Sequence, residues 1–165
     1  MNRGSAIAIY GLVMLAALIL QATVVDFMQI LTWKPDLVLI VLVVIAIDRG
    51  KVAGSSAGFA AGLLSDLMAG PGTLIGLGAL AKSVTGYAAA VGTRFFRRRS
   101  QFIFILLLSG VIHDLLYFYV TTIGRDISWS ILLRGHMIGS LLYTALVGVL
   151  VYPFLGRLFA RYDEP

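Results

Sequence analysis

The chain has 165 residues, of which 59% are hydrophobic and 13% are charged, with a formal net charge of +5. Soluble domains average about 45–50% apolar and about 25% charged residues, so this composition excludes ordinary globular, disordered and fibrous classes and indicates a membrane protein. The sequence has no cysteine, which excludes a disulfide framework, a thiolate metal site and a cysteine nucleophile. The positive charge fits the lysine and arginine bias of cytoplasmic loops better than it fits nucleic-acid binding.

Apolar stretches and turn signals predict an all-α integral membrane protein with six transmembrane helices in one domain, residues 1–165. A helix needs about 20 apolar residues to cross a hydrocarbon core of about 30 Å. Residues 36–93 are divided into three helices by two breaks, Asp48-Arg49-Gly50-Lys51 and Ala69-Gly70-Pro71-Gly72-Thr73. With only two helices in this region, the charges of the first break would lie at bilayer depth. The predicted helices are 4–25, 36–48, 52–69, 74–93, 101–124 and 128–157.

Lysine and arginine are distributed unequally over the two sides of this six-helix arrangement. If the N-terminus is cytoplasmic, nine of them lie on that side, three lie on the other side, and Lys82 lies within a helix. Cytoplasmic loops carry the excess of positive residues in membrane proteins. We therefore expect both termini in the cytoplasm.

Glycine follows a four-residue spacing in the third predicted helix and, around Lys82, in the fourth. Residues four apart share one helix face, and small residues let membrane helices approach closely. These glycines are predicted to form a packing interface, either within the bundle or against a single membrane helix of a partner. They are Gly54, Gly58, Gly62, Gly78 and Gly86.

Six further side chains are polar or ionisable at membrane depth or near it: Asp66, Lys82, His113, Asp114, Arg134 and His136. Asp66 continues the glycine series of its helix, and we expect it to neutralise Lys82 across the short Gly/Pro turn. Such residues are candidates for a proton or ion path, but internal pairing that fixes helix register is favoured because the acidic and basic members balance. A metal site formed by His113, Asp114 and His136 is weakly supported because a third firm ligand is missing. A proton-coupled carrier that uses Asp66 and Asp114 lacks a visible inverted repeat.

The run Gly54-Ser55-Ser56-Ala57-Gly58 matches the G-x-S-x-G pattern of serine hydrolases. That pattern works at a strand–turn–helix elbow, whereas this run lies in an apolar predicted helix. Small-residue helix packing explains it better. We therefore predict no enzyme activity and no catalytic, cofactor-binding or metal-binding residue.

A basic cluster follows the fourth predicted helix and consists of Arg94, Arg97, Arg98 and Arg99. Arginines immediately cytoplasmic of a membrane helix are typical of an anchor to anionic lipids. Binding of a cytoplasmic protein is the alternative, and the sequence does not separate the two.

Several of these features together resemble the rod shape-determining MreD family of bacteria. The resemblance is carried by Pro35-Asp36-Leu37, by the basic turn, by the run from Gly58 to Leu67 ending in Ser65-Asp66-Leu67, and by Gly76, Ala79-Leu80 and Gly86-Tyr87 before the arginine cluster. The length and the six-helix arrangement are also similar to that family.

The resemblance implies a non-catalytic scaffold subunit of the cell-elongation (rod) complex in the bacterial cytoplasmic (inner) membrane, without a cofactor. Its implied partners are MreC directly, RodA and a class B penicillin-binding transpeptidase, and the MreB filament indirectly. The implied fold is similar to the six-helix substrate-binding subunits of energy-coupling-factor transporters.

That fold similarity defines an alternative function, the capture of a vitamin or metal by such a transporter subunit. Those subunits typically dock through an Ala-x-x-x-Ala stripe on their first helix. The alanines of the first predicted helix, at 6, 8, 16, 17 and 22, do not have this spacing, which weighs against the alternative.

Overall fold

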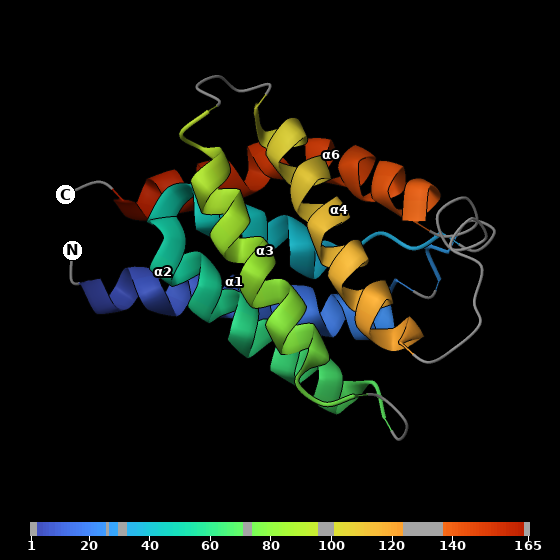
Figure 1. The fold of residues 1–165 in the computed structure, drawn as a ribbon. Coiled ribbons are helices and arrows are strands. Elements are labelled where there is room, and N and C mark those ends of the chain that lie inside the picture. Colours follow the sequence, from blue (N-terminus) through green and yellow to red (C-terminus); the bar gives the residue numbers. More distant parts are fainter. Residues whose placement is uncertain are drawn as a thin grey trace.

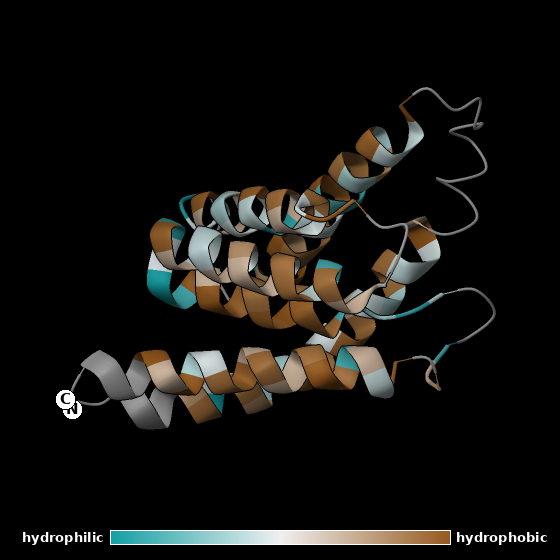
Figure 2. Cartoon of the chain, turned by 90° about the horizontal axis from the view of Figure 1, so that it is seen from below, coloured by the Kyte–Doolittle hydropathy of each residue, from teal (hydrophilic) through white to brown (hydrophobic). Residues whose placement is uncertain are grey.

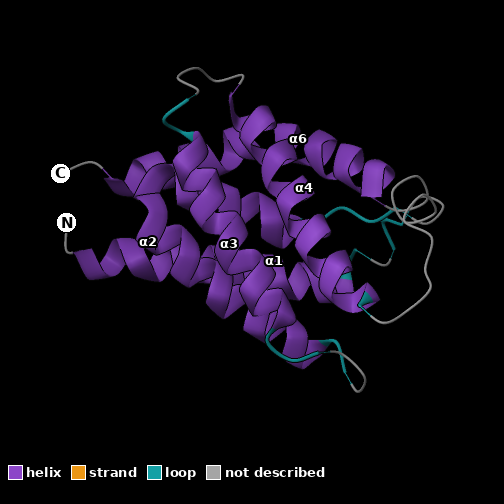
Figure 3. Cartoon of the chain, in the orientation of Figure 1, coloured by secondary structure: helices purple, strands orange, loops and turns teal. Residues whose placement is uncertain are grey.

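The computed structural model describes residues 3–25, 27–29, 33–70, 74–95, 101–123 and 137–163. These residues form five helices joined by loops and turns (Figures 1 and 3). The helices are α1 (Arg3–Thr23), α2 (Leu37–Met68), α3 (Leu77–Gly92), α4 (Gln101–Thr122) and α6 (Ile138–Asp163). The described part of the chain is therefore all-α, as the sequence predicts.

Helix α2 is bent at Gly50, where the backbone has φ 83° and ψ −170°. A Cβ built on Gly54 would lie 2.8 Å from the Cβ of Ala46, although eight residues of straight helix advance about 12 Å. The helix therefore folds back on itself, and Figure 1 shows its change of direction. Glycine adopts a positive φ without steric cost, which allows the bend. The break that the sequence predicts at this position is therefore a bend within one helix, between a first half (37–49) and a second half (51–68).

The first half of α2 forms the centre of the bundle. Every side chain from Val38 to Ala46 is at most 5% exposed, which is the pattern of a helix that is hydrophobic on all sides. It shares one core with residues of α1, α4 and α6, among them Leu18, Leu106 and Phe159. The other helices are thus arranged around this short apolar segment.

The outer surface of the bundle is also apolar. Large hydrophobic side chains such as Leu12, Leu146 and Leu150 are more than 60% exposed, and much of the helical ribbon in Figure 2 has the colour of hydrophobic residues. Gln101–Thr122 and Ile138–Phe159 are long and apolar enough to cross a membrane, and Ile7–Thr23 is a shorter apolar helix. An apolar core inside an apolar exterior defines an all-α membrane protein, because lipid contacts hydrophobic groups at no cost.

The last helix ends later than the predicted limit of residue 157. Helix α6 runs through Pro153 and continues to Asp163. Membrane helices tolerate an internal proline, and a charged residue such as Arg157 ends the apolar stretch without ending the helix. The first part of the predicted helix, residues 128–136, lies outside the described residues.

The two ends of the bundle differ in what they carry. Figure 1 shows both chain termini and the bend of α2 at one end. Arg49 and Lys51 flank that bend, and the exposed Arg157 lies near the end of α6. The structure thus brings these basic residues toward the end of the bundle that is predicted to face the cytoplasm.

Candidate functional site

The glycine faces of α2 and α3 meet backbone to backbone. A Cβ on Gly54 would lie 2.7 Å from the carbonyl oxygen of Gly86, and a Cβ on Gly58 would overlap the carbonyl of Lys82. A Cβ on Gly62 would overlap the backbone of Gly78. All three glycines of the second half of α2 therefore face α3. The sequence left open whether this glycine stripe packs within the bundle or against a membrane helix of a partner, and in the structure it packs within the bundle.

Asp66, the next residue in the glycine series, closes the same interface at the start of α3. Its carboxylate accepts hydrogen bonds from the backbone N–H of Gly76 at 2.8 Å and of Gly78 at 3.0 Å. Gly76, the residue that precedes the helix, has no side chain to cap it. A carboxylate at this place satisfies N–H groups that the first turn leaves open and interacts favourably with the helix dipole.

The expected pairing of Asp66 with Lys82 is therefore wrong. Side-chain atoms of Asp66 lie so close to Gly78 that a Cβ there would collide with them, which places the carboxylate against the α3 backbone. Lys82 lies further along α3 and points to a different carboxylate, that of Asp36, with 3.9 Å between Nζ and Oδ2. A carboxylate can interact either with a cation or with the N–H groups of a helix N-terminus, and Asp66 contacts the N-terminus of α3.

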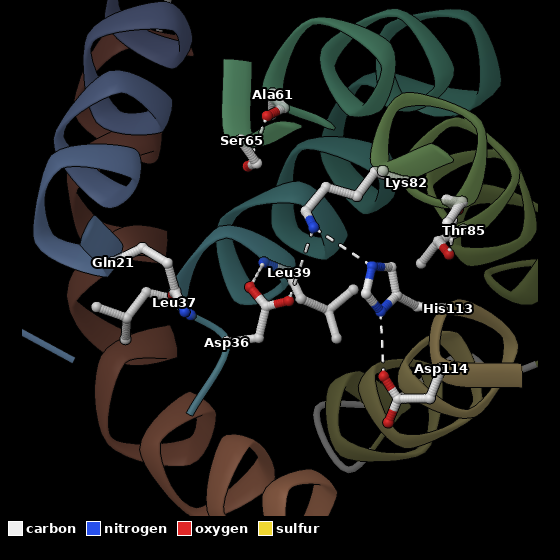
Figure 4. Close-up of polar contacts among 12 residues, drawn as sticks. Gln21, Asp36, Leu37, Leu39, Ala61, Ser65, Lys82, Thr85, His113 and Asp114 are labelled. Carbon is white, nitrogen blue, oxygen red and sulfur yellow. Dashed lines mark hydrogen bonds and ion pairs between the residues drawn. The ribbon is translucent and has the colours of Figure 1, made fainter. Parts of the chain in front are cut away.

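Lys82, His113 and Asp114 form a chain of polar contacts between α3 and α4 (Figure 4). The Nζ of Lys82 lies 3.3 Å from Nε2 of His113, and Nδ1 of His113 lies 3.1 Å from Oδ1 of Asp114. The two ring nitrogens of His113 therefore bridge the amine of Lys82 and the carboxylate of Asp114.

Asp36 joins this chain from the beginning of α2. It is the N-cap of that helix, and its Oδ1 accepts a hydrogen bond from the N–H of Leu39 at 2.8 Å. Gln21 of α1 accepts from the N–H of Leu37 at 2.7 Å, and Thr144 of α6 accepts from the N–H of Asp36 at 3.0 Å. Side chains from two other helices thus hold the carboxylate in place beside Lys82.

We call these residues (Asp36, Lys82, His113 and Asp114) the polar cluster, and two of them, Asp36 and Asp114, line a small cavity. The cavity has a volume of about 220 Å³ and is lined by polar side chains that include Gln21, Lys34, Asp36, Asp114, Ser140 and Thr144. The side chain of Lys82 is 9% exposed, whereas those of Asp36 and Asp114 are 26% and 23% exposed. Asp36 pairs directly with the buried Lys82, and Asp114 is linked to Lys82 through His113. The arrangement thus ties α2, α3 and α4 together through polar and charge-assisted contacts.

Among the described residues, Arg94 and Ser56 lie outside the polar cluster. Arg94 is exposed just after α3. Ser56, the nucleophile position of the G-x-S-x-G match, lies within α2, and its hydroxyl donates to the carbonyl of Val52 at 2.8 Å. The predicted residues that lie outside the described part of the chain are Arg97, Arg98, Arg99, Arg134 and His136.

Sequence reasoning did not include Asp36, Gln21 or Thr144 among the site residues. Asp36 had a visible signal, because an Asp after Pro35 and before an apolar run is a typical helix N-cap. Gln21 stood out as a polar residue within an apolar helix. For Thr144 the sequence holds no comparable signal, since threonine is common in membrane helices.

The structure thus defines an all-α membrane protein that holds its polar groups in internal contacts. Residues 3–162 match the family model of the rod shape-determining protein MreD, and the chain belongs to this family. MreD proteins are structural membrane proteins of bacteria that determine cell shape. No curated protein and no solved structure matches the chain.

Proposed function

We propose that the protein is a non-catalytic scaffold subunit of the bacterial rod complex, in which it helps to couple peptidoglycan synthesis to the cytoskeleton. The observation that carries the proposal is the match to the MreD family over residues 3–162. Its partners are MreC by direct contact, RodA and a class B penicillin-binding transpeptidase, and MreB indirectly. The family match does not favour the alternative of a vitamin- or metal-binding transporter subunit.

The geometry supports a scaffold rather than a conduit. The glycine faces are closed by backbone contact, Asp66 caps a helix, and Lys82 is held between Asp36 and His113. These contacts fix the relative positions of helices, and interhelical hydrogen bonds of this kind contribute about 1 kcal/mol each in membranes. A rigid bundle with an apolar exterior can present fixed surfaces to other membrane proteins.

The proposed topology has six crossings of the inner membrane, with both termini in the cytoplasm and a fold similar to energy-coupling-factor substrate-binding subunits. The two halves of α2 supply two of these crossings, and the bend at Gly50 lies at the cytoplasmic end. Support comes from Arg49 and Lys51 at that bend, since positive residues are retained in the cytoplasm.

Cysteine labelling can test this topology directly, because the sequence contains no cysteine that would first have to be removed. Lys51→Cys and Leu74→Cys place a thiol at the bend of α2 and before α3. We expect a membrane-impermeant maleimide to label Leu74→Cys in intact spheroplasts and to label Lys51→Cys only after the membrane is opened. Labelling of both from the same side would contradict the six crossings.

Co-purification tests the scaffold function. The full chain, extracted in a mild detergent, is expected to capture MreC, and crosslinks mapped to helices identify the contact surface. Depletion of the protein is expected to turn rod-shaped cells into spheres. A tightly bound vitamin or metal ion, without MreC, would instead support the transporter alternative.

A further inference from the structure

A groove lies between α1 and the second half of α2. It has a volume of about 740 Å³, which falls in the range of about 300–1,000 Å³ usual for ligand sites. Its walls are mostly apolar or small side chains, among them Ile7, Met14, Leu18, Ala57 and Leu64. Among the lining residues that the structure describes, Arg49 is the only charged one.

Arg49 marks one end of this groove. It lies just before the bend of α2, and its guanidinium carbon is 4.7 Å from the centre of the Tyr10 ring, near the start of α1. Lys51, on the other side of the bend, lies over the ring of Tyr87 in α3, at 5.3 Å. Of these two cations, the first therefore belongs to the groove and the second faces α3.

The length of the groove matches one leaflet of a bilayer. The stretches from Ile7 to Leu18 on α1 and from Ala53 to Leu64 on α2 each advance about 16 Å, at about 1.5 Å per residue. Half of a hydrocarbon core of about 30 Å is about 15 Å. An occupant of the whole groove thus has an apolar part that reaches to the middle of the bilayer and a polar part beside Arg49.

Gly11 leaves additional room in the wall that α1 contributes. A Cβ built on it would meet no atom within 4 Å, so no contact within the described part of the chain requires a glycine there. Glycine is less favourable than alanine within a helix. Space at this position is therefore available to a molecule in the groove.

From this geometry we infer that the groove binds an anionic phospholipid, with its acyl chains between α1 and α2 and its phosphate at Arg49. Apolar walls of one-leaflet length and a cation at one end are complementary to such a lipid. A transmembrane helix of a partner would continue into the second leaflet, beyond the groove. The lining of the groove does not include Arg94, the described arginine that follows α3, and the inference does not depend on the scaffold function.

Native mass spectrometry of the full chain in mild detergent tests the charge at the end of the groove. The protein is titrated with phosphatidylglycerol and, separately, with phosphatidylcholine. Arg49→Gln is expected to weaken phosphatidylglycerol binding about fivefold, which is the loss for one arginine near anionic lipid. Lys51→Gln is the matched control, because it removes a cation at the same bend but on the α3 side, and it is expected to bind normally.

A second pair of variants tests the groove itself. Gly11→Leu adds a side chain to the groove wall at a position where a Cβ meets no atom within 4 Å, and Gly156→Leu does the same on α6, away from the groove. We expect the first to abolish retention of phosphatidylglycerol and the second to retain it. Equal binding of the two lipids by the unaltered protein, or phosphatidylglycerol binding that survives in both Arg49→Gln and Gly11→Leu, would overturn the inference. Loss of MreC capture in Gly11→Leu with unchanged lipid binding would overturn it too and assign the groove to a partner helix.

Discussion

The second half of α2 packs in two different ways on its two faces. The face with Gly54 and Gly58 touches the α3 backbone directly, whereas the face with Ala53 and Ala57 lines an open groove beside α1. One methyl group per helical turn separates the two cases, because glycine lets backbones meet and alanine keeps a neighbouring helix further away. A single helix thus provides a closed internal seam and an open external surface.

The largest expected effect is at the closed seam. Gly58→Leu should destabilise the fold by about 3 kcal/mol or more, since its side chain would have to displace the backbone of α3. The free energy of unfolding in detergent measures this loss. Gly156→Leu is the control, because a Cβ at that position meets no atom within 4 Å. Equal stability of the two variants would show that the seam is looser than the structure indicates.

A smaller loss is expected at the ion pair beside the seam. Lys82→Met leaves Asp36 without its cation and His113 without its contact to Nζ, and it should cost about 2 kcal/mol. In a double-mutant cycle measured by unfolding, Lys82 should couple more strongly to Asp36 than to Asp66. Stronger coupling to Asp66 would restore the pairing that the sequence suggested.

The carboxylate of Asp66, which caps α3, should contribute less to the stability of the fold than Lys82 does. Asp66→Asn keeps one acceptor oxygen but removes the charge at the helix N-terminus, so it should destabilise the protein by about 1 kcal/mol. Hydrogen exchange at the amides of Gly76 and Gly78 should become faster, because these groups donate to the carboxylate. Unchanged exchange at both amides would refute the capping role. Ser65→Ala is a suitable control, since that hydroxyl bonds only within its own helix, to the carbonyl of Ala61.

A substitution beside the open groove should increase the stability of the fold, whereas the substitutions above decrease it. Gly11→Leu replaces a poor helix former at a position where a Cβ meets no atom within 4 Å, so it should stabilise the fold by about 0.5–1 kcal/mol. The same unfolding measurement as for Gly58→Leu compares the two faces directly. A loss of stability at Gly11 would mean that α1 approaches α2 more closely than the groove implies.

Patterns with a short period were predictable from the sequence. The four-residue spacing of Gly54, Gly58 and Gly62 indicated the seam, because one helix face is defined by spacing alone. The break at Gly50 was visible in its charged neighbours. The helix ends were less predictable, since the sequence marks where the apolar stretch stops, and α6 continues beyond Arg157.

The partners of the buried charges were not predictable, because they depend on how α3 is rotated about its axis. Lys82 could in principle have faced Asp66, and only the packed structure turns it toward Asp36 and His113. One signal was nevertheless present. Gly76 precedes α3 without a capping side chain, so that helix needed an acceptor from elsewhere, and Asp66 was the nearest carboxylate before it in the sequence.

The cap that Asp66 provides also sets an order in which the chain can satisfy its polar groups. The carboxylate is synthesised first, and its donors follow 10 to 13 residues later, at the start of α3. The second half of α2 alone would carry an unsatisfied charge into lipid, and α3 alone would carry open N–H groups. The cap therefore satisfies Asp66 and the start of α3 together, once the two helices of this hairpin are packed against each other.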